Sequence, residues 1–270
     1  MRYLFIQFTN YIIHNNNNFF CQHEHFRSKH QHNDRLLRKL AHLLAQVNCM
    51  NVPIVKDKFH HLDIMIKYIR EGYRSKNVQS LAKELNLKYL IENDFLAEMD
   101  WFESFMRKYS DQCPMVFNHN DFRSTNIMVL KDSEEILFCD FEYCSYGFRG
   151  YDFVTFLMEW DKDIFQLDDI NLPSDDVLEK FIQHYIEGCD QIDPGYSARA
   201  ENSCQKIMND VKIHWLYFLF AFMAISLNQN EVIVENFISN PIQISTGVNF
   251  MFKRYLNFKD SLVKEKIICL

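Results

Sequence analysis

The chain has 270 residues, of which 48% are hydrophobic and 24% are charged, a globular composition. Its formal net charge of −7 provides no basic surface for nucleic acid, so we expect no nucleic-acid partner. It contains only 6 glycines and 5 prolines, which favours a mostly helical body. The 8 cysteines include no C-x-x-C pair, so we expect neither a disulfide framework nor a zinc site, and a reducing, cytoplasmic location.

The N-terminal stretch is polar and repetitive. Residues 14–34 (HNNNNFFCQHEHFRSKHQHND) are dominated by Asn and His and show neither helical nor strand periodicity. This composition is typical of low-complexity segments that do not bury enough apolar surface to fold. We therefore expect a disordered tail over 1–34 and one folded lobe over 35–270.

Apolar residues with helical spacing follow this tail. Leu36, Leu40 and Leu44 share one helical face, and Asn33 or Asp34 stands before them at the N-cap position. Another helix begins near Ser174. Further helical patterns cover about 60–73, 91–109, 198–228 and 245–262.

The segment 213–227 (IHWLYFLFAFMAISL) is the membrane candidate of this sequence. Its 15 residues fall short of the roughly 20 that a spanning helix needs. We therefore expect a buried core helix there and no transmembrane segment.

The middle of the chain changes to a strand pattern. The run PMVFN (114–118) predicts a short strand. The runs NIMVL (126–130) and EILFCD (135–140), separated by the turn-rich KDSE, predict a β-hairpin. The predicted fold class is therefore α+β and mostly helical, with a small β-hairpin.

The stretch FNHNDFRSTN (117–126) lies between the first of these strands and the hairpin. His119, Asp121 and Asn126 follow the order H-x-D-x-x-x-x-N, and Asp140 comes 19 residues after Asp121, at the end of the hairpin. Each residue alone is a common turn residue, and that structural interpretation stays open for any one of them. The four residues in register favour a phosphotransferase site.

The spacing matches the chemistry of phosphoryl transfer. Asp121 is placed as the base that accepts the proton of an acceptor hydroxyl. Asn126 and Asp140 supply the hard oxygen ligands that Mg²⁺ prefers, and the metal holds the phosphates of ATP. The hairpin brings Asp140 back beside Asn126, so we expect the active site at this hairpin.

Two longer stretches resemble the choline/ethanolamine kinase family. HNDFRSTNIMVL and ILFCDFEYCSYGFRGYDFVTFLMEW are similar to its motifs H-N-D-x-x-x-x-N-I, I-D-F-E-Y, R-G-F-D and E-W. The resemblance implies a protein-kinase-like C-terminal lobe that phosphorylates the hydroxyl of choline or ethanolamine with Mg²⁺ and ATP, the first step toward phosphatidylcholine or phosphatidylethanolamine. It also implies a possible homo- or heterodimer with family members.

The same resemblance implies roles for further residues. Glu142 matches a family carboxylate near the metal, and Glu159 with Trp160 matches the E-W pair that serves the metal or the cationic substrate. Tyr217 and Phe220 fall where the family holds its cationic substrate between aromatic rings, an arrangement that cation–π attraction favours. Core packing in an apolar helix is the open alternative for these two rings.

His119 is expected to orient the loop rather than to transfer a proton. In the family, an N-terminal lobe carries a phosphate-covering loop and a strand lysine that grip ATP. The first 34 residues contain neither a Gly-rich loop nor such a strand. We therefore expect the chain alone to phosphorylate choline or ethanolamine slowly or not at all. A catalytically impaired family member that acts as a binding or regulatory partner is the alternative.

Overall fold

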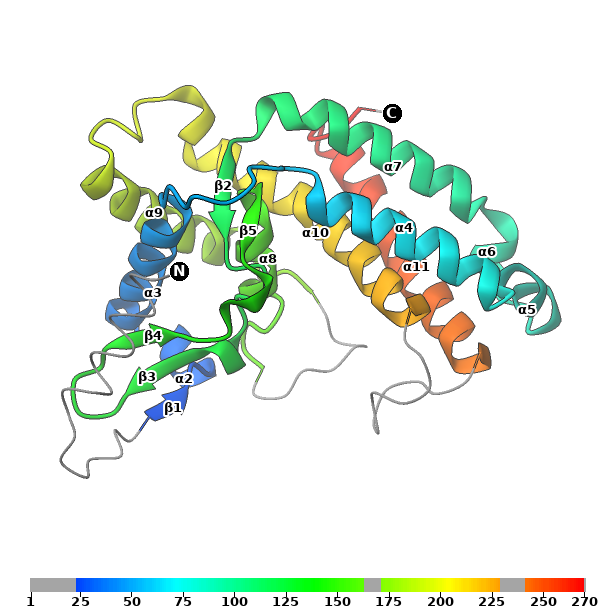
Figure 1. The fold of residues 1–270 in the computed structure, drawn as a ribbon, viewed down its shortest axis with the longest axis horizontal. Coiled ribbons are helices and arrows are strands. Elements are labelled where there is room, and N and C mark those ends of the chain that lie inside the picture. Colours follow the sequence, from blue (N-terminus) through cyan, green and yellow to red (C-terminus); the bar gives the residue numbers. More distant parts are fainter. Residues whose placement is uncertain (1–22, 163–170, 229–240, 270) are drawn as a thin grey trace.

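The computed structural model describes residues 23–162, 171–228 and 241–269. Its mostly helical, α+β architecture agrees with the predicted fold class (Figure 1). In chain order, the helices and strands are β1 (His23–His25), α2 (Ser28–Gln31), α3 (Asp34–Asn48), α4 (His60–Ser75), α5 (Val78–Glu84), α6 (Lys88–Glu92), α7 (Phe95–Tyr109), β2 (Met115–Asn118), β3 (Ile127–Leu130), β4 (Ile136–Phe138), β5 (Ser145–Phe148), α8 (Gly150–Leu157), α9 (Asp175–Ile192), α10 (Cys204–Asn228) and α11 (Pro241–Lys264).

Helix α10 is the centre of the helical body. It packs against α4, α8, α9 and α11, and Figure 1 shows α4, α7, α10 and α11 running side by side. By length and composition, α10 could cross a membrane over Cys204–Leu227, but 78% of the apolar window is buried inside the fold. A helix that is apolar on all sides belongs in a protein core or in a membrane, and its burial here agrees with the predicted core helix.

A glycine lets α4 approach α10 closely. A Cβ atom at Gly72 would lie 2.6 Å from Cβ and 2.7 Å from the carbonyl oxygen of Leu227. Real Cβ atoms do not approach other atoms so closely, so this contact requires a residue without a side chain. The packing of the two long helices is therefore fixed at this point.

Two small antiparallel sheets frame the segment 119–126. One has the strand order β1-β3-β4, and the other pairs β2 with β5. The β3–β4 register sets Ile127 opposite Phe138 and Val129 opposite Ile136, which confirms the predicted hairpin. The segment 119–126 joins the end of β2 to the start of β3, so both of its ends are held by hydrogen-bonded strands.

The expected disorder of the N-terminal tail is wrong for residues 23–34, whereas residues 1–22 lie outside the described residues. Strand β1 pairs with β3, with Glu24 opposite Val129, and the side chain of Phe26 is fully buried. Asn33 then caps α3, because its side chain accepts hydrogen bonds from two backbone N–H groups of the first helical turn. A partner strand 100 residues away decides the structure of β1, and local composition does not encode it.

The helix predicted over 91–109 is interrupted in the structure. It divides into α6 and α7, because the Asp94 side chain accepts hydrogen bonds from the backbone N–H groups of Leu96 and Ala97 and starts a new helix. Such N-capping competes with continuation of the preceding helix. Helix α5 was not predicted.

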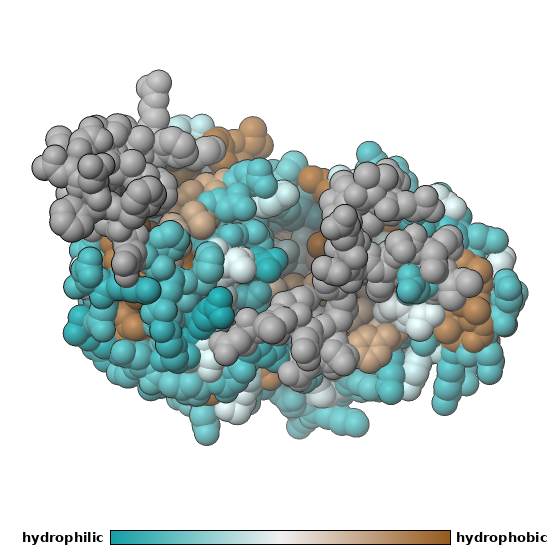
Figure 2. All heavy atoms as spheres, turned by 90° about the horizontal axis from the view of Figure 1, so that it is seen from below, coloured by the Kyte–Doolittle hydropathy of each residue, from teal (hydrophilic) through white to brown (hydrophobic). Residues whose placement is uncertain are grey.

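The surface is mainly polar where the structure describes it. Figure 2 shows hydrophilic side chains over most of the described part of one face, with apolar side chains between them. Large apolar side chains are exposed at separate positions along the chain, among them Val55 at 82% and Tyr143 at 54%. Single exposed apolar residues are ordinary on protein surfaces, but Tyr143 lies in the region of the predicted site.

Candidate active site

A buried carboxylate anchors the polar loop 119–126. Asp152, in the first turn of α8, accepts hydrogen bonds from the backbone N–H groups of His119 and Asn120, both at 2.8 Å. The side chain of Asn48 lies 3.5 Å from the same carboxylate and donates to the carbonyl oxygen of Phe117. Burial raises the pKa of Asp152, and the two N–H groups oppose that rise by stabilising the ionised form. Asn48 at the end of α3 and Asp152 in α8 thus hold the start of the loop.

His119 links the loop to the end of β4. Its Nε2 lies 2.9 Å from the carbonyl oxygen of Cys139, and its Nδ1 accepts a hydrogen bond from the backbone N–H of Asp121. Because a carbonyl oxygen only accepts, Nε2 carries the ring proton and Nδ1 is the acceptor. The ring is fully buried and both of its nitrogens are bound to backbone, so the geometry favours the positioning role expected for His119.

Asp121 and Asn126 lie in direct contact. Asn126 Nδ2 donates to the Asp121 carboxylate at 2.6 Å and to the Asp121 carbonyl oxygen at 3.0 Å. These two bonds occupy the amide nitrogen and leave the amide oxygen of Asn126 as a possible metal ligand. The backbone N–H of Cys139 donates to the Asn126 carbonyl oxygen, so the residue before Asp140 is tied to the same loop.

Asp140 and Glu142 lie at the exposed side of this loop. Asp140 has a φ of 64°, in the left-handed region that few residues other than glycine adopt, and a 3-10 turn over Phe141–Tyr143 follows it. The charge of Glu142 is the first cause that raises the pKa of Tyr143, and the charges of Asp121 and Asp140 add to it. Asp140 thus begins the turn that carries Glu142 and the exposed Tyr143.

The oxygen atoms of this loop fit a hard cation. No three side chains of the His, Cys, Asp and Glu type form a metal-holding group within the described ranges. Mg²⁺ does not need such a cage, because it is commonly held by one or two protein oxygens together with phosphate oxygens and water. The Asn126 amide oxygen and the Asp140 carboxylate are the oxygens predicted for this role.

Glu159 and Trp160 lie behind the loop. Glu159 is buried and accepts a hydrogen bond from the backbone N–H of Ser124 at 2.7 Å, and Arg123 lies 3.6 Å from its other oxygen. The Trp160 ring packs on Phe156, with centroids 6.2 Å apart. In this position Glu159 braces the loop through its backbone, and substrate contact for the pair stays a prediction.

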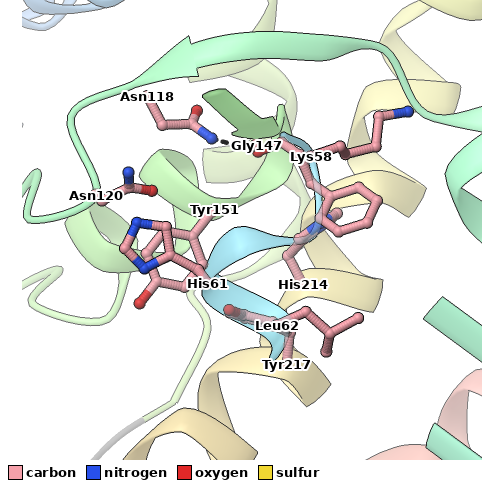
Figure 3. A pocket seen from close by; sticks show the side chains of 10 residues that line it. Lys58, His61, Leu62, Asn118, Asn120, Gly147, Tyr151, His214 and Tyr217 are labelled. Carbon is pink, nitrogen blue, oxygen red and sulfur yellow. Dashed lines mark hydrogen bonds between the residues drawn. The ribbon is translucent and has the colours of Figure 1, made fainter. Parts of the chain in front are cut away.

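A small pocket opens beside the loop (Figure 3). Asn120, the residue before Asp121, lines this pocket, so the pocket adjoins the predicted base. Tyr217 lines the pocket, and its ring meets that of Tyr151 edge to face at 5.2 Å, whereas its substrate contact stays a prediction. The pocket is lined by Lys58, His61, Leu62, Asn118, Asn120, Gly147, Phe148, Tyr151, His214 and Tyr217.

Phe220 is not among the residues that line this pocket. Its ring is fully buried and packs on Tyr255 and Phe102, with centroids 4.4 Å and 4.7 Å away. Side chains three residues apart on a helix point about 60° apart, which is enough for Tyr217 to face the pocket and Phe220 to face the core. This position favours the core-packing alternative for Phe220.

The sequence did not single out Asp152, Asn118 or His61. Asp152 had a usable signal, because it is the acidic residue of the R-G-Y-D stretch and is followed by an apolar run that predicts burial. Asn118 and His61 had none, because they line one pocket only when α4 packs beside β5, the strand that pairs with β2.

Comparison with known proteins shows to which family the chain belongs. A family model described as choline/ethanolamine kinase matches residues 4–255 of this chain. The chain belongs to the choline/ethanolamine kinase family. Its members in other organisms include a human choline/ethanolamine kinase, 28% identical over 168 residues, and a probable ethanolamine kinase B of Dictyostelium discoideum, 32% identical over 108 residues.

The chain matches only part of these relatives. The segment aligned with the human protein covers 54% of this chain and 38% of the human protein. The segment aligned with the Dictyostelium protein covers 40% of this chain and 23% of that protein. The chain therefore spans well under half the length of these two curated relatives.

Solved structures show the same fold. A choline kinase of Cryptosporidium parvum gives a TM-score of 0.60 at 16% identity over 92% of this chain and 72% of its own. An ethanolamine kinase of Plasmodium vivax gives a TM-score of 0.63 at 16% identity over 92% and 66%. These likenesses confirm the predicted kinase-like architecture.

Proposed function

We propose that this chain carries out phosphoryl transfer from ATP to the hydroxyl of a small amino alcohol of the choline/ethanolamine class. The observation that carries the proposal is the 2.6 Å contact between Asp121 and Asn126, in a loop held by Asp152. The family to which the chain belongs supports the same chemistry.

Each part of the loop has a distinct task in this proposal. Asp121 accepts the proton of the substrate hydroxyl as the oxygen attacks the terminal phosphorus of ATP, the bond from that phosphorus to the β-phosphate oxygen breaks, and ADP leaves. Asn126 and Asp140 would hold Mg²⁺, which when bound neutralises charge on the phosphates. His119 and Asp152 are positioning residues, because they hold the backbone on either side of Asp121 and the end of β4 through hydrogen bonds to main-chain groups. The pocket beside Tyr151 receives the amino end of the substrate.

A single-turnover assay tests the proposal. The purified chain is incubated with radiolabelled ATP, Mg²⁺ and either ethanolamine or choline, and the phosphorylated alcohol is separated and counted. We expect product that depends on Asp121, with Asp121→Asn lowering the rate about 10²-fold or more, the usual contribution of a general base. Single-turnover conditions keep a slow reaction measurable.

The matched control is Asp132→Asn, which removes an exposed carboxylate in the turn between β3 and β4. The control should keep the rate of the unaltered chain. Equal product from Asp121→Asn would refute the assignment of this loop, and the absence of phosphorylated product would refute the proposed activity of this chain.

A further inference from the structure

The pocket beside the loop contains buried polar atoms that lack partners. Asn118 Oδ1, His61 Nε2 and His214 Nε2 are all buried and have no hydrogen-bond partner. All three residues line the pocket. Buried polar atoms in native proteins are nearly always paired, because an unpaired one costs free energy. Three such atoms around one pocket indicate a polar occupant.

The orientation of Asn118 is fixed. Its Nδ2 donates to the carbonyl oxygen of Phe148 at 2.9 Å, the bond that Figure 3 shows as a dashed line. A Cβ atom at Gly147 would lie 2.9 Å from the same nitrogen, so glycine makes room for this arrangement. The unpaired atom of Asn118 is therefore the oxygen, which is an acceptor.

Both histidines also present acceptors. His214 Nδ1 lies 2.6 Å from the carbonyl oxygen of Asp210, so Nδ1 carries the ring proton and Nε2 is a bare lone pair. Burial lowers the pKa of His214 to about 4, which keeps the ring neutral at pH 7. Burial also lowers the pKa of His61, whose ring is hydrogen-bonded to the backbone of Tyr143 and leaves Nε2 unpaired.

The amine and amide donors around the pocket are already used. The Lys58 ammonium donates to the carbonyl oxygens of Ser110 and Cys113, at 2.6 Å and 2.7 Å, and Figure 3 shows it pointing away from the pocket. The Asn120 amide donates to Tyr143 and Ser145. Apart from the hydroxyls of Tyr151 and Tyr217, the pocket therefore has no free donor, and an occupant that carries donors fits its three acceptors.

Charge and size narrow the occupant further. Asp121 directly follows Asn120 of the pocket lining, and aromatic rings such as those of Tyr151 and Tyr217 attract cations. The cavity leaves about 10 Å³ open to the centre of a water molecule, which is roughly the room for one water. An –NH₃⁺ group has that size and carries three donors, whereas a trimethylammonium group is larger and has none.

We propose that this pocket binds the primary ammonium group of an ethanolamine-type substrate and discriminates against the quaternary ammonium group of choline. The inference rests on the proposed function, because it assigns the amino end of the same substrate.

Isothermal titration calorimetry on the purified chain tests the inference without requiring turnover. The ligands are ethanolamine, N-methylethanolamine, N,N-dimethylethanolamine and choline, in which methyl groups replace the donors one at a time. We expect affinity to fall along the series, with choline at least about tenfold weaker than ethanolamine, because one hydrogen bond to a charged group is commonly worth about tenfold.

Two variants link the effect to the acceptors. Asn118→Leu keeps the size of the side chain and should weaken ethanolamine about tenfold while changing choline little. If circular dichroism shows that Asn118→Leu does not fold, His61→Phe replaces it, because His61 is half-buried. The same two affinities, for ethanolamine and for choline, are then compared in His61→Phe. Asn51→Leu is the matched control, because Asn51 is exposed and does not line the pocket.

The outcomes separate the two proposals. Choline binding as tightly as ethanolamine, or equal losses for both ligands in the variants, overturns the discrimination and leaves the kinase function in place. Binding of none of the four amino alcohols overturns the proposed function together with this inference.

Discussion

Replacing Asp152 by asparagine tests how the active-site loop is held. The substitution keeps the size of the side chain but exchanges one acceptor oxygen for an NH₂ group. In the structure, the two carboxylate oxygens each receive a backbone N–H of the loop, from His119 and from Asn120. In Asp152→Asn, one of these N–H groups faces a donor and loses its partner.

The magnitude follows from these contacts. A hydrogen bond to a charged group contributes roughly 1.5–3 kcal/mol, and a buried unpaired N–H costs a similar amount. The carboxylate is itself costly to bury, as its raised pKa indicates, and removing its charge offsets part of the loss. We therefore expect the free energy of unfolding to fall by about 2 kcal/mol, which lowers Tm by about 4–8 °C in a domain of this size.

The expected functional effect is larger than the effect on stability. Because Asp152 holds the backbone next to Asp121, a displaced loop should lower the single-turnover rate by about 10²-fold. Binding of the amino alcohol should change much less. The assay combines thermal unfolding, single-turnover phosphorylation and calorimetry, with Asp176→Asn, an exposed aspartate of α9, as the matched control.

Two results would refute this reasoning. An Asp152→Asn protein with unchanged Tm would show that the N–H contacts contribute no net stability. A protein destabilised as expected but fully active would show that the loop does not depend on this anchor for its geometry.

Three further substitutions test the packing and the pH response. Gly72→Ala should lower the free energy of unfolding by roughly 1–3 kcal/mol in denaturant titrations, because the new Cβ would lie 2.6 Å from Leu227 Cβ. Glu71→Ala, at the exposed neighbouring position, is the control. Equal stability of the two variants would contradict the contact. Arg149→Met should lower the free energy of unfolding by about 3 kcal/mol, because it removes the guanidinium partner of the buried Asp210 carboxylate. An Arg149→Met protein as stable as the unaltered chain would show that this ion pair adds no stability. The pKa of His214 is lowered by burial to about 4, below its value in the unfolded chain, so its contribution to stability is present above pH 6.5 and is lost as pH falls toward 4, by up to about 3 kcal/mol. Unfolding at pH 7 and pH 4.5 should show a smaller difference for His214→Phe, and an unchanged difference would contradict the assignment.

Much of the site could be predicted from the sequence because it is local. The residues from His119 to Asn126 form one loop, and a hairpin with ordinary strand patterns returns the chain to Asp140. Their spacing along the chain therefore already expresses their proximity, and the structure shows the contact between Asp121 and Asn126 directly. The long core helix was equally visible, because its apolar residues are continuous over several turns.

The features that sequence reasoning missed depend on distant partners. Strand β1 consists of His-Glu-His, which has no strand pattern. It is a strand because its backbone pairs with the backbone of β3. Tyr217 and Phe220 look alike in sequence, yet one lines the pocket and the other is buried in the core. Their difference depends on the rotation of α10, which the neighbouring helices set.

The sequence alone therefore determined the mostly helical fold class and the prediction of a base and metal oxygens, because short-range spacing and periodicity carry that information. Only the tertiary structure decided how the loop is anchored and which residues line the pocket beside it. Asp152 reaches the loop from α8, and the pocket collects residues from α4, β2, β5, α8 and α10. No local sequence pattern predicts these contacts between distant segments, because each contact depends on how whole helices pack.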